Sequence, residues 1–343
     1  MSATPDPALD GLDIPALERF LAQHVPGFSG RLSARLLPGG RSNLTFVLTD
    51  GTRRWVLRRP PLGELTPSAH DMGREYRVVA ALAGSGVPVA RAVALAGPGV
   101  LDVPFSVVEH VDGRVIRTTG QLHALAPADI ARCAHALVDV LARLHQVEPA
   151  AVGLAGFGQP GGYLARQVRR WHSQWRLVQT RPLEDIGTLH ARLAEACPAE
   201  SGASVVHGDY RIDNTILDYE DPAVIRAVVD WEMATLGDPL ADLALHLVYA
   251  DPAFAPVLAG AASTSDRLPP AADLAQRYAS ASGRELAHLE FYLGLGYFKI
   301  AVIAEGIHAR HQRGMTRGTG FDHVGDAVAP LAAAGLRALS KGL

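Results

Sequence analysis

Two polar clusters, each placed directly after a short apolar run, carry the chemistry that this sequence suggests. Two valines enter a His-x-Asp-x-x-x-x-Asn pattern formed by His207, Asp209 and Asn214, and a second apolar run ends sixteen residues after Asn214, in Asp230. Phosphoryl transfer to a hydroxyl needs a carboxylate that accepts the hydroxyl proton, and oxygen ligands that hold Mg²⁺ on the nucleotide phosphates. The spacing therefore predicts Asp209 as the catalytic proton acceptor and Asn214 and Asp230 as the Mg²⁺ ligands.

A loop of turn-forming Asp and Asn residues is the simpler explanation of the same letters. A lone His-x-Asp-x-x-x-x-Asn arises easily by chance in a long chain, but here Asp-Trp follows a second strand, and Gly-Asp-Pro-x-x-Asp follows that. The combined spacing favours a catalytic loop. Within it, we expect His207 to form structural hydrogen bonds, and Asp238 and Asp242 to cap and anchor the next helix, with Asp213 as a turn residue.

A glycine-rich turn in the first third of the chain is the expected contact for nucleotide phosphates. Gly39, Gly40, Ser42 and Asn43 lie between two predicted strands. Glycines let backbone N–H groups approach phosphate oxygens, and the Ser and Asn side chains add donors. Taken alone, these residues are better explained by an ordinary hairpin turn, and it is their position in the chain that favours the phosphate contact.

An arginine takes the position where a phosphate-binding lysine would be expected. Arg58 ends the second predicted strand and Glu75 lies on the next predicted helix, whereas the only lysines of the chain are Lys299 and Lys341. An ion pair in this region must therefore use arginine, which keeps the charge and can bind phosphate through two N–H groups. We predict a pair between Arg58 and Glu75, with Arg59 on the opposite face of the strand.

The pattern of apolar residues indicates a β-rich first third followed by helices. Alternation predicts strands from Leu36 to Arg58, broken by turns at 39–40 and 50–51, and further strands over 87–93 and 105–108. Helical spacing predicts helices that begin after Asp13 and that cover 72–82, 130–145, 162–179, 186–196 and 286–311. Such a chain fits an α+β fold with two lobes.

Composition excludes several other classes of protein. The chain has 343 residues and a formal net charge of −3, with a pI near 6.5, which argues against a nucleic-acid-binding surface. Two cysteines without metal-ligand spacing suggest a reduced, cytoplasmic protein. No signal peptide is visible, and the most apolar segment, 291–304, is too short to cross a membrane.

Taken together, these motifs resemble the catalytic loop and metal-binding Asp of protein kinases, in the His-Gly-Asp and Asp-Trp-Glu form of aminoglycoside phosphotransferases and choline kinases. The segments 56–61, 68–70, 74–77 and 207–211 are most similar to kinase-like proteins that are fused to, or encoded beside, acyl-CoA dehydrogenases. Two features depart from the protein-kinase pattern. Arg58 replaces the lysine, and the glycine-rich turn is shorter than Gly-x-Gly-x-x-Gly.

The resemblance implies a protein-kinase-like fold with an N-lobe over 1–108, a hinge over 109–113 and a helical C-lobe over 114–343. It also implies ATP as co-substrate, with adenine read in the hinge by backbone groups of Glu109 and Val111. A functional link to an acyl-CoA dehydrogenase follows from the same branch.

The nature of the phosphoryl acceptor stays open between classes. The branch implies a hydroxy acid or a hydroxyacyl-CoA. An aminoglycoside is the alternative, but it is polycationic, and the carboxylates of the last third are scattered among arginines and histidines. The basic stretch of His308, Arg310, His311, Arg313 and Arg317 could meet an anionic substrate, although a solvated helix end is favoured. A nucleotide-binding scaffold of the pseudokinase type is the rival from another class.

Overall fold

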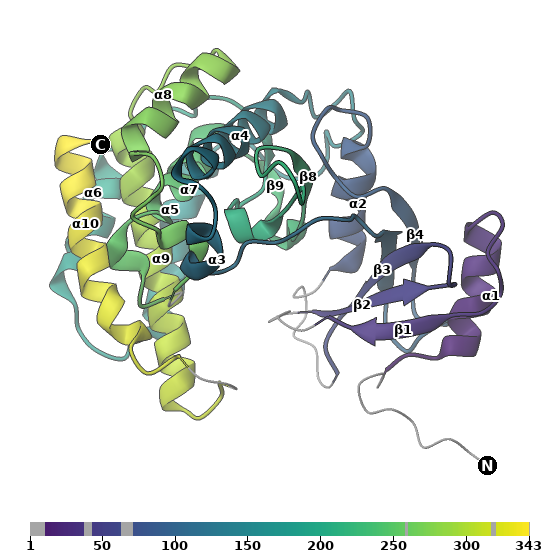
Figure 1. Cartoon of the computed structure of the whole chain (residues 1–343). Helices are drawn as coiled ribbons and strands as arrows, with labels where there is room; N and C mark the ends of the chain where they lie inside the picture. Colours follow the sequence, from purple (N-terminus) through teal and green to yellow (C-terminus); the bar gives the residue numbers. More distant parts are fainter. Residues whose placement is uncertain (1–10, 38–42, 63–70, 258–259, 317–319, 343) are drawn as a thin grey trace. The chain divides into compact units, whose positions relative to one another are not determined.

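The computed structural model describes residues 11–37, 43–62, 71–257, 260–316 and 320–342 (Figure 1). It divides into two compact units. Unit 1 comprises Met1–Asp112 with Ala227–Glu232, and unit 2 comprises Gly113–Arg226 with Met233–Leu343. The short segment Ala227–Glu232 therefore packs with the first third of the chain, and it carries Asp230. The functional lobes and the hinge at 109–113 stay a prediction.

Unit 1 contains a five-stranded antiparallel sheet in the order β1-β2-β3-β5-β4. Its strands are β1 (Ser33–Leu36), β2 (Leu44–Thr49), β3 (Arg54–Arg59), β4 (Ala92–Ala96) and β5 (Phe105–Glu109). The Asp50-Gly51 turn joins β2 to β3 as predicted, because the Asp50 carboxylate accepts from the backbone N–H groups of Thr52 and Arg53. The strand predicted over 87–93 is wrong, since the structure begins that strand at Ala92.

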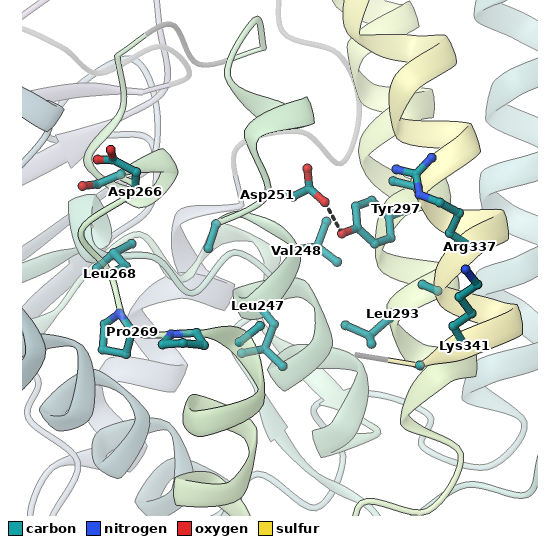
Figure 2. Close-up of a pocket in the computed structure, with 17 residues that line it drawn as sticks. Leu247, Val248, Asp251, Asp266, Leu268, Pro269, Leu293, Tyr297, Arg337 and Lys341 are labelled. Carbon is teal, nitrogen blue, oxygen red and sulfur yellow. Dashed lines mark hydrogen bonds between the residues drawn. The ribbon is translucent and has the colours of Figure 1, made fainter.

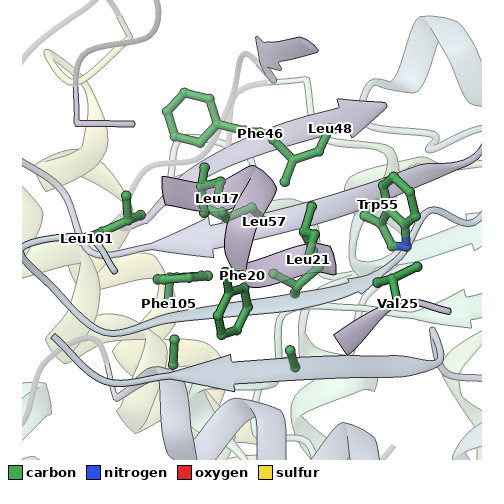
Figure 3. Packing of buried hydrophobic residues seen from close by; sticks show 13 residues of the cluster. Leu17, Phe20, Leu21, Val25, Phe46, Leu48, Trp55, Leu57, Leu101 and Phe105 are labelled. Atoms are coloured by element: carbon green, nitrogen blue, oxygen red, sulfur yellow. The ribbon is translucent and has the colours of Figure 1, made fainter. Parts of the chain in front are cut away.

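Helix α1 (Ile14–His24) covers one face of this sheet. Its N-terminus is capped as predicted, with the Asp13 carboxylate accepting from the backbone N–H of Ala16 at 2.9 Å. Figure 3 shows the core that the helix forms with alternate strand residues, which are Leu17, Phe20, Leu21, Phe46, Leu48, Trp55, Leu57 and Phe105. Because side chains alternate along a strand, the residues between these on β3 point away from α1.

Helix α2 (Met72–Leu82), which begins and ends where the sequence predicts, supplies the partner for one of those residues. Arg58 stands between Leu57 and Arg59 on β3, and its side chain contacts Glu75 on α2. Arg59 points the other way and is buried, where its guanidinium donates to backbone carbonyl groups of Gly11 and Pro60. The alternation of β3 thus places Arg58, and not the adjacent Arg59, beside α2.

Unit 2 is mainly helical. Its helices are α3 (Thr119–His123), α4 (Pro127–Gln146), α5 (Tyr163–Val178), α6 (Glu184–Glu195), α7 (Pro239–Val248), α8 (Ala271–Ser282), α9 (Leu289–Gln312) and α10 (Val328–Lys341). The structure extends the sequence prediction by α3, α8 and α10. No helix in the described part of the chain has the length and apolar character that a membrane span needs.

Short strands and tight turns between these helices hold the predicted catalytic loop. β6 (Ser204–Val206) pairs antiparallel with β9 (Thr235–Gly237). Between them, the chain forms the 3₁₀ turn η2 (Ile212–Asn214), β7 (Thr215–Leu217) and β8 (Ile225–Val228). The buried β6 and the N-terminal end of α7 therefore flank the loop that carries Asp209.

Candidate active site

Asp209 lies in the loop after β6, and three side chains hold its carboxylate. The hydroxyl of Tyr249 donates to Oδ1, and Nε of Arg211 lies 3.3 Å from the same oxygen. The side-chain nitrogen of Asn214 donates to Oδ2 at 3.1 Å and to the backbone oxygen of Asp209 at 2.8 Å. The carboxylate is therefore kept in one orientation, which a positioned proton acceptor requires.

The backbone on the N-terminal side of Asp209 is anchored by Asp242. This buried carboxylate accepts from the backbone N–H groups of His207 at 2.6 Å and Gly208 at 2.8 Å, and it lies 3.3 Å from Nε2 of His145. Burial opposes ionisation of Asp242, but its hydrogen bond to His145 and the charges of His145 and His207 outweigh burial, so its pKa lies below the usual value. The sequence predicts that Asp242 anchors the next helix, and the family resemblance implies that it also supports the catalytic loop; these contacts confirm the support of the loop.

The residues on either side of this anchor also match their predicted structural roles. The ring nitrogen Nδ1 of His207 accepts from the backbone N–H of Asp209 at 3.2 Å. Asp238 caps α7 by accepting from the backbone N–H of Leu240 at 3.0 Å. Gly208 adopts a φ of +80°, and a Cβ at that position would lie 2.8 Å from the backbone oxygen of Met233. Only glycine fits there without displacing the loop.

Asn214 and Asp213, adjacent residues of η2, have different partners. The amide nitrogen of Asn214 is used by Asp209, so its amide oxygen is the atom left for a cation. Asp213 instead lies 3.2 Å from Nη2 of Arg211. Burial raises the pKa of Asp213 more than Arg211 lowers it. Asn214 is thus the better placed of the two for a metal.

In unit 1, Arg58 joins two carboxylates from distant parts of the sequence. Its Nη1 contacts Glu75 on α2, as predicted, and its Nη2 lies 3.2 Å from Oδ1 of Asp230. The Glu75 side chain is buried, whereas that of Asp230 is 36% exposed. The exposed carboxylate of Asp230 can therefore reach a ligand, while Glu75 serves to hold the guanidinium.

Asp230 adopts an unusual backbone conformation. Its φ is +66°, in the left-handed region that Asp and Asn tolerate better than most residues. Such a conformation costs about 1–3 kcal/mol and is kept where surrounding contacts enforce it. The indole N–H of Trp231 donates to the backbone oxygen of Val228 at 3.0 Å and closes the turn around Asp230. This turn directs the Asp230 carboxylate to Arg58.

Glu75 is an acid in an unfavourable environment. Burial raises its pKa to about 7, more than the neighbouring Arg58 lowers it, and the charges of Asp230 and Glu232 add to the increase. Two carboxylates, those of Glu75 and Asp230, thus contact the Arg58 guanidinium, and the charge of Glu232 also acts on it. A site with this excess of negative charge is suited to receive a cation.

Of the remaining predicted nucleotide contacts, only Asn43, Glu109 and Val111 lie within the described residues. Gly39, Gly40 and Ser42 lie outside the described residues, and Asn43 is buried just before β2. The Glu109 carboxylate pairs with Arg91 near the surface, and the Glu109 backbone N–H donates to the Arg91 carbonyl at 2.8 Å. In the described part of the chain, the backbone N–H of Val111 has no protein acceptor, so it is available to a ligand.

The chemistry of the predicted ligand pair fits Mg²⁺. Asn214 offers an amide oxygen and Asp230 a carboxylate, and Mg²⁺ prefers oxygen donors and keeps several positions for water or phosphate. Among the residues that the structure describes, no group of three or more His, Cys, Asp or Glu side chains could hold a metal by itself.

A separate cavity of about 570 Å³ lies in unit 2, among the end of α7, the start of α8, α9 and α10 (Figure 2). The Tyr297 hydroxyl donates to Asp251 there at 2.5 Å, and Arg337 and Lys341 stand along α10. The cavity contains none of the residues predicted from sequence. The predicted basic stretch lies elsewhere, with Arg310 and Arg313 exposed at the end of α9, and Arg317 is outside the described residues.

Several residues beside Asp209 are not predicted from sequence. Tyr249 comes from the end of α7, and Lys299 from α9, where its Nζ donates to the backbone oxygen of Gly208 at 2.7 Å. Of Tyr249 and Lys299, only Lys299 stands out in the sequence, because it is one of the two lysines of the chain. Tyr249 has no local pattern that would mark it.

The chain is similar to known proteins in family, sequence and structure. A family model described as "Phosphotransferase enzyme family" matches residues 33–279. Human acyl-CoA dehydrogenase family member 11 is 34% identical over 339 residues, which is 96% of this chain and 43% of the human protein. Mouse acyl-CoA dehydrogenase family member 10 is 33% identical over 87% of this chain and 28% of its own length. The chain thus spans less than half of these relatives.

Among solved structures, a Ralstonia eutropha protein provisionally named an aminoglycoside phosphotransferase is 33% identical, with a TM-score of 0.82 over 96% of this chain and 98% of that one. Aminoglycoside phosphotransferase APH(4)-Ia, in a ternary complex with AMP-PNP and hygromycin B, has a TM-score of 0.62 at 18% identity, over 96% of this chain and 100% of that one. The predicted α+β, protein-kinase-like fold is confirmed.

Proposed function

The chain belongs to the phosphotransferase enzyme family and is a kinase with a hydroxyl acceptor, and we propose that it transfers the γ-phosphoryl group of Mg-ATP to a small molecule. The observation that carries this proposal is Asp209, whose carboxylate is oriented by Tyr249, Arg211 and Asn214 on a loop anchored by Asp242. ATP is also supported by the complexes of structures that share the fold, one of which binds AMP-PNP.

Asp209 accepts the proton of the acceptor hydroxyl while the hydroxyl oxygen forms a bond to the γ-phosphorus of ATP. The bond between that phosphorus and the β–γ bridging oxygen breaks, and its electron pair leaves with ADP. Asp209 then releases the proton to water. General-base assistance of this kind contributes about 10²- to 10⁴-fold to a rate.

Arg58, Asn214 and Asp230 serve the nucleotide phosphates. Asn214 and Asp230 would hold Mg²⁺, which neutralises the phosphate charge and orients the phosphates when it is bound. Arg58 donates to phosphate oxygens while Glu75 fixes its guanidinium. The glycine-rich turn with Gly39, Gly40, Ser42 and Asn43 contributes further donors, as its residue types suggest.

The backbone of Glu109 and Val111 reads the adenine base. The support for this assignment is local. The Glu109 backbone N–H is already used by the Arg91 carbonyl, whereas the backbone N–H of Val111 has no protein acceptor among the described residues and can donate to a base edge, with the Glu109 carbonyl assigned as the acceptor by its position. A donor and an acceptor two residues apart match one edge of adenine.

The acceptor that fits best is a hydroxy acid or a hydroxyacyl-CoA. An aminoglycoside would need carboxylates to balance its positive charges, but the carboxylates next to Asp209 are already engaged. Asp213 pairs with Arg211, and Asp242 is buried beneath backbone N–H groups. The similarity to acyl-CoA dehydrogenase family members 10 and 11 points the same way and supports a functional link to an acyl-CoA dehydrogenase.

A non-catalytic nucleotide-binding scaffold is less well supported, because every predicted catalytic position holds a competent residue. The test is a coupled ATPase screen of hydroxyacyl-CoAs, hydroxy acids, choline and aminoglycosides, with product masses confirmed. We expect one phosphoryl group to be added to a hydroxy acid or hydroxyacyl-CoA. Phosphorylation of an aminoglycoside alone would overturn the acceptor class, and nucleotide binding without turnover of any acceptor would favour the scaffold.

A further inference from the structure

Lys299 brings the ammonium group of a long, largely buried helix to the catalytic loop. It lies in α9, and its Nζ donates at 2.7 Å to the backbone oxygen of Gly208, the residue before Asp209. The indole ring of Trp171 lies 5.7 Å from Nζ, measured to the ring centroid. The lysine therefore borders the loop that carries the proton acceptor.

This ammonium group has unused hydrogen-bonding capacity. An ammonium has three N–H donors, and within the described residues Gly208 provides its one protein acceptor, with no carboxylate within 4 Å. Burial lowers the pKa of Lys299, while the charges of Asp209 and Asp242 oppose that change. A half-buried cation with no carboxylate in direct contact is costly, which favours an anion arriving from a ligand.

The choice of lysine is itself informative in this chain. Only two of the 32 residues counted as Lys or Arg are lysines. Arginine presents a broad planar fork, whereas lysine presents a compact point charge at the end of a flexible stem. A lysine here, where arginine is otherwise used, fits a single small anionic group better than a bidentate partner.

We propose that Lys299 is a catalytic residue that donates to a non-bridging oxygen of the phosphoryl group during its transfer. The inference rests on the proposed function, in which Asp209 accepts the proton of the attacking hydroxyl. The phosphoryl group that this hydroxyl attacks must then come within a few ångströms of the Asp209 carboxylate. Lys299 gives up no proton. It binds charge on the phosphoryl oxygens while the hydroxyl oxygen bonds to phosphorus and ADP departs with the bridging oxygen.

The test measures binding of Mg-ADP with and without aluminium fluoride, which mimics a transferring phosphoryl group and needs no acceptor. In wild type we expect aluminium fluoride to tighten retention of Mg-ADP. In Lys299→Met that gain falls about 100-fold, the size typical of losing one charge-stabilising donor, while the affinity for Mg-ADP alone is unchanged. Lys341→Met, at the other lysine of the chain, is the matched control and should behave like wild type.

Two further variants separate a catalytic from a structural role. Asp209→Asn should keep the aluminium fluoride gain, since no proton is moved in this complex. Lys299→Gln keeps an N–H for the Gly208 carbonyl without the charge, and should lose the gain as Lys299→Met does. An undiminished gain in Lys299→Gln, or in a folded Lys299→Met, would overturn the proposal. Failure of wild type to bind Mg-ADP at all would instead count against the proposed function.

Discussion

The carboxylate of Asp242 accepts a hydrogen bond from the backbone N–H of Gly208 at 2.8 Å, across 34 residues of sequence. A second bond, from the backbone N–H of His207, makes Asp242 the acceptor for two consecutive groups of the catalytic loop. Buried N–H groups that lose their acceptor are costly, so this one side chain couples the position of the loop to the packing of α7.

We therefore expect Asp242→Asn to lower the free energy of unfolding by about 3 kcal/mol, because the amide nitrogen of Asn is a donor that would face donor groups of the loop or of His145, whose Nε2 then loses its carboxylate partner. Chemical denaturation followed by circular dichroism measures the change. Asp273→Asn, at an exposed position of α8, should leave stability within about 0.5 kcal/mol of wild type. Equal stability of Asp242→Asn and Asp273→Asn would show that the anchor is dispensable.

Tyr249→Phe removes the hydroxyl that donates to Asp209. Burial raises the pKa of Tyr249 well above its usual value, and the charge of Asp209 adds to this, so the hydroxyl keeps its proton as a donor. We expect kcat to fall about tenfold, the equivalent of one hydrogen bond to a charged group, with the KM for ATP unchanged. Steady-state kinetics decide the matter, and a changed KM with an unchanged kcat would contradict the assignment of Tyr249 to the proton acceptor.

The two proposed metal ligands should contribute unequally to Mg²⁺-dependent ATP binding. Asp230→Ala should weaken Mg²⁺-dependent ATP binding about 10- to 100-fold, and Asn214→Ala should mainly raise the Mg²⁺ concentration needed, since a carboxylate neutralises charge and an amide does not. Isothermal titration calorimetry with ATP over a series of Mg²⁺ concentrations measures both effects. Glu220→Ala, an exposed carboxylate after β7, is the control. ATP binding that needs no Mg²⁺ and is equal in wild type and Asp230→Ala would refute this ligand set.

The raised pKa of Glu75 predicts a pH dependence with a definite sign. The pKa of Glu75 is about 7 in the folded chain, against the ordinary glutamate value of 4.5 that we take for the unfolded chain. The folded state holds this proton more tightly, so its stabilising contribution is complete below about pH 4.5 and is lost as the pH rises to about 7. The free energy of unfolding of wild type, relative to Glu75→Gln, should decline across that interval. A difference that stays constant from pH 4 to 8, or one that rises, would mean that Arg58 keeps Glu75 ionised.

Much of the fold and part of the site can be predicted from sequence, because the signals are local. The bounds of α2 follow from helical spacing, and the contact of Arg58 with Glu75 follows from the alternation of β3 followed by that helix. The cap at Asp238 follows from a short motif at the start of α7, and the contact of Asp242 with the catalytic loop follows from the family resemblance.

The residues that sequence does not reveal reach the site through tertiary packing. Tyr249 and Lys299 contact the catalytic loop across 40 and 91 residues of sequence. Their side chains reach the catalytic loop because α7 and α9 pack together. No local sequence pattern predicts that packing. Asp230 is a ligand candidate from its motif, but its partner Arg58 lies 172 residues away and its left-handed φ has no sequence signature.

The measurement that tests the central claim most directly compares wild type with Asp209→Asn for transfer of the labelled γ-phosphoryl group of ATP to the acceptor found in the screen. The amide keeps the shape of the side chain but cannot accept the hydroxyl proton. We expect Mg-ATP binding to match wild type while the transfer rate falls about 10²- to 10⁴-fold. A wild-type rate of transfer in Asp209→Asn would contradict the assignment of Asp209 as proton acceptor.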